Sequence, residues 1–193
     1  MSTATKLTGK DTLLLLLYSP GVMDDPNEKI RGRTRLVKMI FLFQEEIYQK
    51  FKFDIENLAK FVEWKFGPWS EEVYSDIEFF KSIGFIGIEA EENNASDITS
   101  EEVEEFEKWE DNISLTDYAT DEYQQEVFTL TSLGKKYIEN NKIFDSLSEN
   151  QKAGLKEFKK KFNGVSLFSI LRYVYEKYPK YILKSEIKNQ ILS

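Results

Sequence analysis

One segment of the chain is far more acidic than the rest. Residues 89–126 contain 15 Asp and Glu residues against the single basic residue Lys108, a charge of −14, whereas the remaining residues contain 19 acidic and 25 basic side chains, a charge of +6. Charge-rich insertions cost little stability when they lie in surface loops. We therefore expect a mildly basic folded body, built from the segments on either side, that carries an acidic insert at about 89–126.

Three segments before the acidic insert have the apolar spacing of helices. They are the short apolar run at 10–18, the apolar stripe at 34–50 and a third stripe at 71–83. Asp11 lies near the start of the first segment, and Ser70 is a good N-cap for the third. We expect all three segments to be helices that contribute to one core.

Three shorter segments have the character of strands. The alternating sequence FVEWKF at 61–66 predicts a half-buried strand, and residues 85–88 and 127–130, which flank the acidic insert, predict an antiparallel pair. A connection of roughly 35 residues is long for a hairpin. Within it, Thr99 and Glu102 have the spacing of a capping box, which predicts a short helix inside the insert.

The stretch KFGPWSEEV at 65–73 joins the first strand to the third helix. One Gly followed by Pro lacks the successive backbone N–H donors of a phosphate loop, and a chain without His or Cys has none of the common nucleophile elbows. We therefore expect a structural corner. In this corner Pro68 fixes the turn and Ser70 starts the helix. Glu71 and Glu72 make the first turn of the helix acidic.

The order of helix, helix, helix and hairpin is that of a winged helix. Thr131 begins a further helix, the chain is helical again from Ser148, and a weaker terminal helix is expected at 181–192. The predicted fold class is mainly α (α+β), a winged-helix-like core with a small antiparallel β-hairpin and additional C-terminal helices. Residues 1–145 would form the winged-helix-like domain, and residues 146–193 a C-terminal helical extension packed on the same domain.

The absence of cysteine and histidine excludes several classes of chemistry. Disulfides, thiolate nucleophiles, zinc-finger ligands and Ser-His or Cys-His dyads all require one of these residues. Carboxylate, Lys, Tyr or Ser chemistry and carboxylate sites for Mg²⁺ remain available. No apolar run approaches the ~18 to 20 residues that span a bilayer, so we expect a cytoplasmic protein with no membrane partner.

Four stretches together resemble a family of small prokaryotic winged-helix-like proteins. They cover most of the chain outside the insert and are GRTRLVKMIFLFQ (32–44), FGPWSEEVYSDIEFFKSIGFI (66–86), LTSLG (130–134) and LRYVYEKYP (171–179). The sequence is similar to the YwgA-like group and, more distantly, to the Panacea or SocA-like domain. Panacea-type domains are associated with toxin neutralisation and adaptor roles, so the resemblance implies a protein-binding module without catalysis.

A cluster of basic side chains lies around the start of the second helix, where the helix dipole disfavours positive charge. A bound phosphate or carboxylate would explain it, because helix-start N–H groups and Arg side chains together bind anions. The alternative is pairing with Asp24, Asp25 or Glu28 of the preceding loop, or with the acidic insert. The members of the cluster are Lys29, Arg31, Arg33, Arg35 and Lys38.

A second basic patch follows on the helix after Ser148. Lys152, Lys156 and Lys160 share one face, with Lys159 and Lys161 beside them. Such a face can hold a nucleic-acid backbone as point charges, although nothing in it reads a base edge, and the alternative is a solvated helix surface. The candidate nucleic-acid or anion-binding residues are Arg31, Arg33, Arg35, Lys38, Lys156 and Lys160.

The third helix is acidic, although in a winged helix this element normally enters the major groove of DNA. It carries Glu71, Glu72, Asp76 and Glu78 against Lys81, and these carboxylates would repel phosphates. A protein partner is therefore favoured, with the helix and the aromatic residues near it or at the C-terminus as its contacts. The candidate partner-binding residues are Trp69, Glu71, Glu72, Asp76, Tyr173 and Tyr175. Five aromatic residues could form a stacking platform, and the alternative is burial in the core. They are Trp64, Trp69, Tyr74, Tyr173 and Tyr175.

The first hypothesis is a non-enzymatic protein-binding adaptor or antitoxin-like module, a component of a prokaryotic toxin–antitoxin or phage-defence system. Its partner would be a toxin, an effector or a defence subunit, and it would need no cofactor, catalytic residue or metal site. The alternative is a winged-helix nucleic-acid-binding transcriptional regulator. A third alternative, a hydrolase with a carboxylate-bound metal, predicts binding of Mg²⁺ or Mn²⁺.

Overall fold

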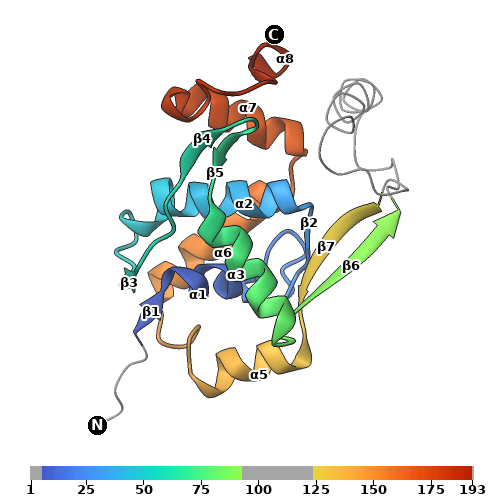
Figure 1. Ribbon diagram of the computed structural model, residues 1–193. Coiled ribbons are helices and arrows are strands. Elements are labelled where there is room, and N and C mark those ends of the chain that lie inside the picture. Colours follow the sequence, from blue (N-terminus) through green and yellow to red (C-terminus); the bar gives the residue numbers. More distant parts are fainter. Residues whose placement is uncertain (1–5, 93–123, 193) are drawn as a thin grey trace.

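A computed structural model describes residues 6–92 and 124–192 of the chain (Figure 1). The short helix predicted inside the acidic insert lies outside these residues. The helices are α1 (Gly9–Tyr18), α2 (Arg33–Leu42), α3 (Glu71–Ser82), α5 (Ser132–Asn140), α6 (Glu149–Asn163), α7 (Leu167–Lys177) and α8 (Lys188–Leu192). The strands are β1 (Leu7–Thr8), β2 (Ile30–Arg31), β3 (Ile55–Glu56), β4 (Val62–Trp64), β5 (Gly67–Trp69), β6 (Ile86–Glu92) and β7 (Gln124–Leu130). The chain is therefore mainly α-helical with small sheets, as predicted.

The starts of the helices follow the capping residues seen in the sequence. Asp11 accepts hydrogen bonds from the backbone N–H of Thr8 at 2.7 Å and from its hydroxyl at 2.9 Å, which fixes the first turn of α1. The Ser70 hydroxyl accepts from the N–H of Val73 at 3.3 Å at the start of α3. The Thr131 hydroxyl accepts from the N–H of Gly134 at 3.1 Å at the start of α5. The predictions for these helices are confirmed because each cap satisfies an N–H that the helix leaves unpaired.

Two predicted helices differ from the structure. The helix expected at 34–50 is α-helical only to Leu42 and continues as a π-helix over Phe43–Tyr48. The terminal helix expected at 181–192 is wrong: a 3₁₀ turn at Pro179–Tyr181 and a turn follow α7, and only Lys188–Leu192 is helical. Tertiary hydrogen bonds hold this segment out of a helix. The Ser185 and Tyr175 hydroxyls lie 2.7 Å apart, and the N–H of Glu186 donates to the Lys65 carbonyl at 2.9 Å.

The predicted antiparallel pair is confirmed and longer than expected. β6 pairs with β7 from Ile86 opposite Leu130 to Glu92 opposite Gln124. Figure 1 shows the two strands as a long ribbon on the right of the molecule. The sequence did not predict β2, which pairs with the other edge of β7 and makes a sheet of order β2-β7-β6.

The Gly-Pro stretch is a strand and not only a corner. Gly67–Trp69 forms β5, which pairs antiparallel with β4 across the two-residue turn Lys65-Phe66. Gly67 has a φ of +81°, a conformation that favours glycine. Pro68 lies opposite Glu63 in this short ladder, at an edge position where a strand tolerates a residue without an N–H. The expected corner is therefore the second half of a hairpin.

The core is built around α1, whose residues Leu13 to Leu17 are at most 1% exposed. Helices α2 and α3, α5 and strand β7 contact it, and Figure 1 shows α3 crossing the front of the molecule below the β4–β5 hairpin. Residues of α6 and α7 belong to the same cluster of buried side chains. Over the described residues, no helix is long and apolar enough to cross a membrane.

We predict that Gly134→Ala destabilises the protein, although alanine normally favours a helix. A β-carbon at this position would lie 2.1 Å from the carbonyl oxygen of Phe85, which is backbone and cannot move aside without shifting a segment next to β6. The expected loss in the free energy of unfolding is about 1 to 3 kcal/mol, measured by urea titration.

Lys136→Ala is the matched control for this variant, because Lys136 is exposed on the same helix. Its free energy of unfolding should stay within about 0.5 kcal/mol of the parent value. An unchanged midpoint for Gly134→Ala would contradict the close approach of α5 to Phe85.

Candidate functional site

A strip of exposed and half-buried side chains runs from the β4–β5 hairpin onto α3. We call Val62, Trp64, Trp69 and Tyr74 the aromatic row. The ring centroids of Trp64 and Trp69 are 5.7 Å apart, as are those of Trp69 and Tyr74. Val62 lies directly opposite Trp69 in the hairpin. Val62 is 50% exposed and Trp64 48%, whereas Trp69 and Tyr74 are half-buried, so Val62 and Trp64 present the apolar surface of the row to solvent.

The other side of the hairpin is fixed to the core. The buried Lys38 ammonium of α2 donates a hydrogen bond to the Pro68 carbonyl at 2.8 Å. Below Gly67 lies the ring of Tyr175, so close that a β-carbon on this glycine would come within 2.9 Å of it. Phe61, which precedes β4, packs edge-on against Phe41 of α2 with centroids 5.2 Å apart. The aromatic row therefore sits on a rigid support.

Lys38 is only 3% exposed, so it is not available to a nucleic acid, and its assignment to the anion-binding set is wrong. Burial lowers the pKa of Lys38 to about 7, because desolvation disfavours the ammonium form. The apolar spacing of α2 did not indicate that Lys38 is buried. The carbonyl that accepts its hydrogen bond belongs to Pro68, 30 residues further along the chain.

Arg33 also binds within the protein. Its Nε and Nη2 donate to the two carboxylate oxygens of Glu126, both at 2.8 Å, and its Nη1 donates to Glu78 at 2.9 Å. The guanidinium carbon lies 5.5 Å from the centroid of the Tyr74 ring. The hydrogen bonds to Glu126 raise the pKa of Arg33 above its ordinary value. Arg33 thus links α2 to α3 and β7. Of the two explanations for this basic residue, pairing with a carboxylate of the acidic segment applies, and the carboxylate is that of Glu126.

Arg35 and Lys159 bind backbone carbonyls. Arg35 donates to the carbonyls of Phe162 at 2.8 Å and Val165 at 2.6 Å, at the C-terminal end of α6, and burial lowers its pKa to about 10. Lys159 is fully buried, and its ammonium donates to three carbonyls of the α1 end and the loop after it: Leu17 at 3.1 Å, Ser19 at 2.6 Å and Glu28 at 2.6 Å. The prediction that Arg35 belongs to an open anion-binding cluster is therefore wrong, as is the placing of Lys159 in a basic surface patch. Both side chains bind carbonyls within the protein.

Three members of the anion-binding set remain on the surface. Arg31 is exposed on β2, and Lys160 is exposed on α6. Lys156 pairs with Asp24 at 2.6 Å. The structure does not bring them together with Arg33, Arg35 and Lys38 into one open anion site, because the latter three are engaged inside the protein.

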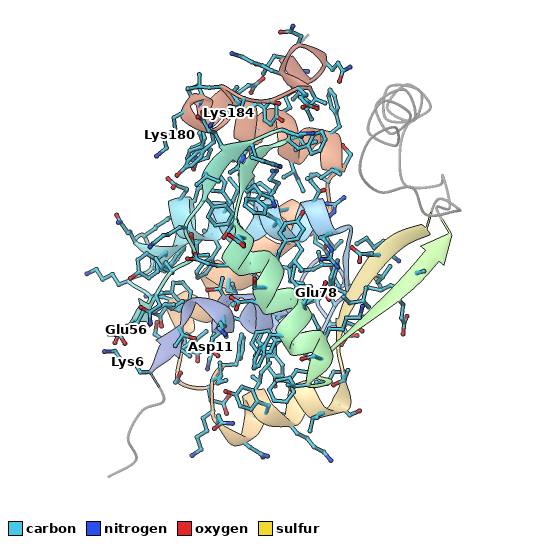
Figure 2. The ribbon with its side chains drawn as sticks, viewed as in Figure 1. Lys6, Asp11, Glu56, Glu78, Lys180 and Lys184 are labelled. Atoms are coloured by element: carbon cyan, nitrogen blue, oxygen red, sulfur yellow. The ribbon has the colours of Figure 1, made fainter. Side chains whose placement is uncertain are left out.

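The acidic residues of α3 differ in their partners. Asp76 lies 3.4 Å from the Lys10 ammonium, and burial raises the pKa of Asp76. Glu78, labelled on α3 in Figure 2, binds Arg33. Glu71 and Glu72 are exposed in the first turn, next to Trp69 in sequence, and Glu72 accepts a hydrogen bond from the backbone N–H of Lys60 at 2.5 Å. The first turn therefore adds two exposed carboxylates to the edge of the aromatic row.

The two tyrosines predicted on α7 do not join this surface. Tyr175 is 1% exposed and lies beneath the hairpin, so the prediction that it binds a partner is wrong and the core alternative applies. The Tyr173 hydroxyl accepts a hydrogen bond from the Lys177 ammonium at 2.8 Å, and Lys177 also binds Glu46 of the π-helix at 2.9 Å. Tyr173 is half-buried in a separate cluster with Phe162.

The sequence did not indicate Val62 as a surface residue, and it offered Trp64 only as one of five aromatic residues that could form a stacking platform or lie in the core. The alternating FVEWKF pattern did place Val62 and Trp64 on one face of a strand, but it did not show which face is exposed. Among the described residues, no group of three or more acidic side chains could hold a metal ion. This part of the chain therefore offers no site for the metal that the hydrolase alternative requires.

We predict that Arg33→Lys lowers the free energy of unfolding by about 1 to 2 kcal/mol, because an ammonium cannot donate along two parallel directions to Glu126 and also reach Glu78. Urea titration measures the loss. Arg172→Lys is the control, since Arg172 makes an exposed pair with Glu176 on one helix at 3.1 Å and should cost at most about 0.5 kcal/mol. Equal effects of the two changes would contradict the linking role of Arg33.

We predict that stability rises with pH between about 7 and 10, because of Lys38 and Lys159, whose pKa values burial lowers to about 7. Over this range the unfolded state still binds a proton on each lysine, with an ordinary pKa of 10.5, while the folded state has released it. Lys38→Met should flatten the profile by up to about 1.4 kcal/mol per pH unit. Urea titrations at several pH values test this, and an unchanged slope in Lys38→Met would contradict it.

The comparison with known protein families identifies the chain. A family described as "Antitoxin SocA-like, Panacea domain" matches residues 36–179, which include the β4–β5 hairpin, α3 and α7. No curated protein and no solved structure matches the chain. The match covers most of the sequence and confirms the predicted resemblance to the Panacea, or SocA-like, domain. The chain belongs to the antitoxin SocA-like, Panacea domain family.

Proposed function

We propose that this protein is a non-enzymatic, antitoxin-like binding module that holds a protein partner on the aromatic row. The observation that carries the proposal is the half exposure of Val62 and Trp64 on a hairpin whose other side is fixed to the core. Exposed apolar surface of this kind costs solubility and is typical of interaction sites. The partner would be a toxin, an effector or a defence subunit, in keeping with the antitoxin-like family.

The chemistry of the aromatic row suits a binding surface. Trp and Tyr contribute most to the stability of protein interfaces, because they bury a large area while losing little side-chain freedom. The hydrogen bond from Lys38 and the packing of Phe61 hold the hairpin in place before a partner arrives. A preformed surface reduces the entropy lost on binding.

The proposal includes the architecture expected from the sequence. The order α1, α2, α3 and then β6 and β7 supports a winged-helix-like core. The antitoxin-like family supports a role in the cytoplasm. Contacts of Arg35 and Lys159 between α6 and earlier segments support one domain in which the C-terminal helices are an integral part. The nucleic-acid alternative is weaker, because Arg33, Arg35 and Lys38 already have partners inside the protein and α3 is acidic.

We predict that the partner is lost when the aromatic row is truncated. The tagged protein, expressed in its native host, should recover one protein in stoichiometric amount, and Trp64→Ala should reduce that recovery by at least about tenfold, the effect of losing a central interface tryptophan. If the partner slows growth when expressed alone, the parent protein should restore growth and Trp64→Ala should not.

Phe79→Ala is the matched control, because Phe79 is an exposed aromatic residue of α3 outside the row, 45% exposed. It should leave recovery unchanged, and urea titration should show that both variants are folded. Full recovery of the partner by Trp64→Ala, or recovery of nucleic acid alone by the parent protein, would overturn the proposal.

A further inference from the structure

Aromatic and acidic side chains on α3 bind cations at two places. At the first, Lys10 lies over the ring of Phe79, 4.7 Å from its centroid, and 3.4 Å from the carboxylate of Asp76. At the second, the Arg33 guanidinium lies 5.5 Å from the centroid of Tyr74 and 2.9 Å from the carboxylate of Glu78. In both cases the ring face and the carboxylate attract the same positive charge.

A third place of this composition lies at the start of the helix. Trp69 and Trp64 supply the rings, and Glu71 and Glu72 of the first turn supply the carboxylates. Within residues 6–92 and 124–192, no lysine or arginine pairs with either of these glutamates or lies over either tryptophan ring.

Two lysines beside the hairpin already have other partners. Lys65 lies 3.6 Å from Glu186, and Lys184 lies 3.1 Å from Glu63, whose side chain points to the other face of the hairpin from that of Trp64. Figure 2 shows Lys184 beside the hairpin, on the C-terminal segment. The hydrogen bond from the Lys60 N–H holds the carboxylate of Glu72 at the edge of the row.

We propose that the aromatic row binds a basic segment of the partner, and that an arginine of this segment stacks on Trp64 and Trp69 and pairs with Glu71 and Glu72. This inference rests on the proposed function, since it describes the partner of the same surface. Arginine fits better than lysine because its planar guanidinium stacks on a ring and donates to a carboxylate along its edge at the same time. The partner surface is therefore basic, and its association with this protein is favoured at low salt.

The test uses the full chain and a capped seven-residue peptide of alternating Arg and Ser, with a peptide carrying citrulline for arginine as the uncharged control. Nuclear magnetic resonance of the indole N–H groups reports binding at Trp64 and Trp69. The arginine peptide should shift both resonances and the citrulline peptide should not. Trp64→Ala, and Glu71→Gln with Glu72→Gln, should each weaken binding at least about fivefold.

The matched control is Glu139→Gln with Glu149→Gln, which removes the same charge from exposed positions of α5, at the opposite end of the molecule from the β4–β5 hairpin in Figure 1, and of the start of α6. It should change the affinity less than about twofold, because charges separated by more than a Debye length are screened. No shift of the indole resonances at millimolar peptide, or equal weakening by the two glutamine pairs, would overturn the inference.

Recovery of the natural partner separates this inference from the proposed function. If Trp64→Ala loses the partner but the Glu71→Gln, Glu72→Gln variant keeps it at every salt concentration, the protein-binding function holds and the basic-segment inference fails. If Trp64→Ala keeps the partner while the arginine peptide still shifts the indole resonances of the parent protein, the proposed function fails and the cation site holds.

Discussion

The fold depends on the complete burial of α1. A helix that is apolar on every side must be covered on every side, and Leu13 to Leu17 receive this cover from α2, α3, α5 and β7. The C-terminal end of such a helix leaves carbonyls that solvent cannot reach. Lys159 of α6 binds the Leu17 carbonyl and those of the following loop, so α6 is placed by the same requirement.

Buried and half-buried cations make many of the long-range links in this protein. Lys38 holds the hairpin, Arg33 joins α2 to α3 and β7, and Arg35 closes the end of α6. Each cation exchanges hydration for hydrogen bonds to carbonyls or carboxylates, so removing it leaves acceptors unpaired. The same arrangement takes positive charge off the surface and leaves the first turn of α3 acidic, beside the exposed Trp64 and the half-buried Trp69.

The sequence predicted local structure well and tertiary placement poorly. Ser70 and Thr131 mark helix starts because their hydroxyls act within three residues, and the β6–β7 pair follows from two short apolar segments. Trp69, Glu71 and Glu72 were predicted as surface residues beside one another for similar local reasons. The burial of Tyr175 and Lys38 depends on Gly67 and Pro68, which are distant in sequence, and periodicity alone does not distinguish a buried cation from a solvated one.

Strand β7 is tied to the rest of the fold at Glu126, close to the Glu92/Gln124 end of the β6–β7 ladder. Arg33 donates two hydrogen bonds to the Glu126 carboxylate, and the N–H of Gly32 donates to the Glu126 carbonyl at 2.8 Å, so β7 is held by α2 and the residue before it. Doubling the length of a flexible connection costs only about 0.6 kcal/mol of closure entropy. A change in the length or the sequence of the connection between β6 and β7 should therefore leave the stability of the core nearly unchanged, so recognition and folding can be altered separately in this protein.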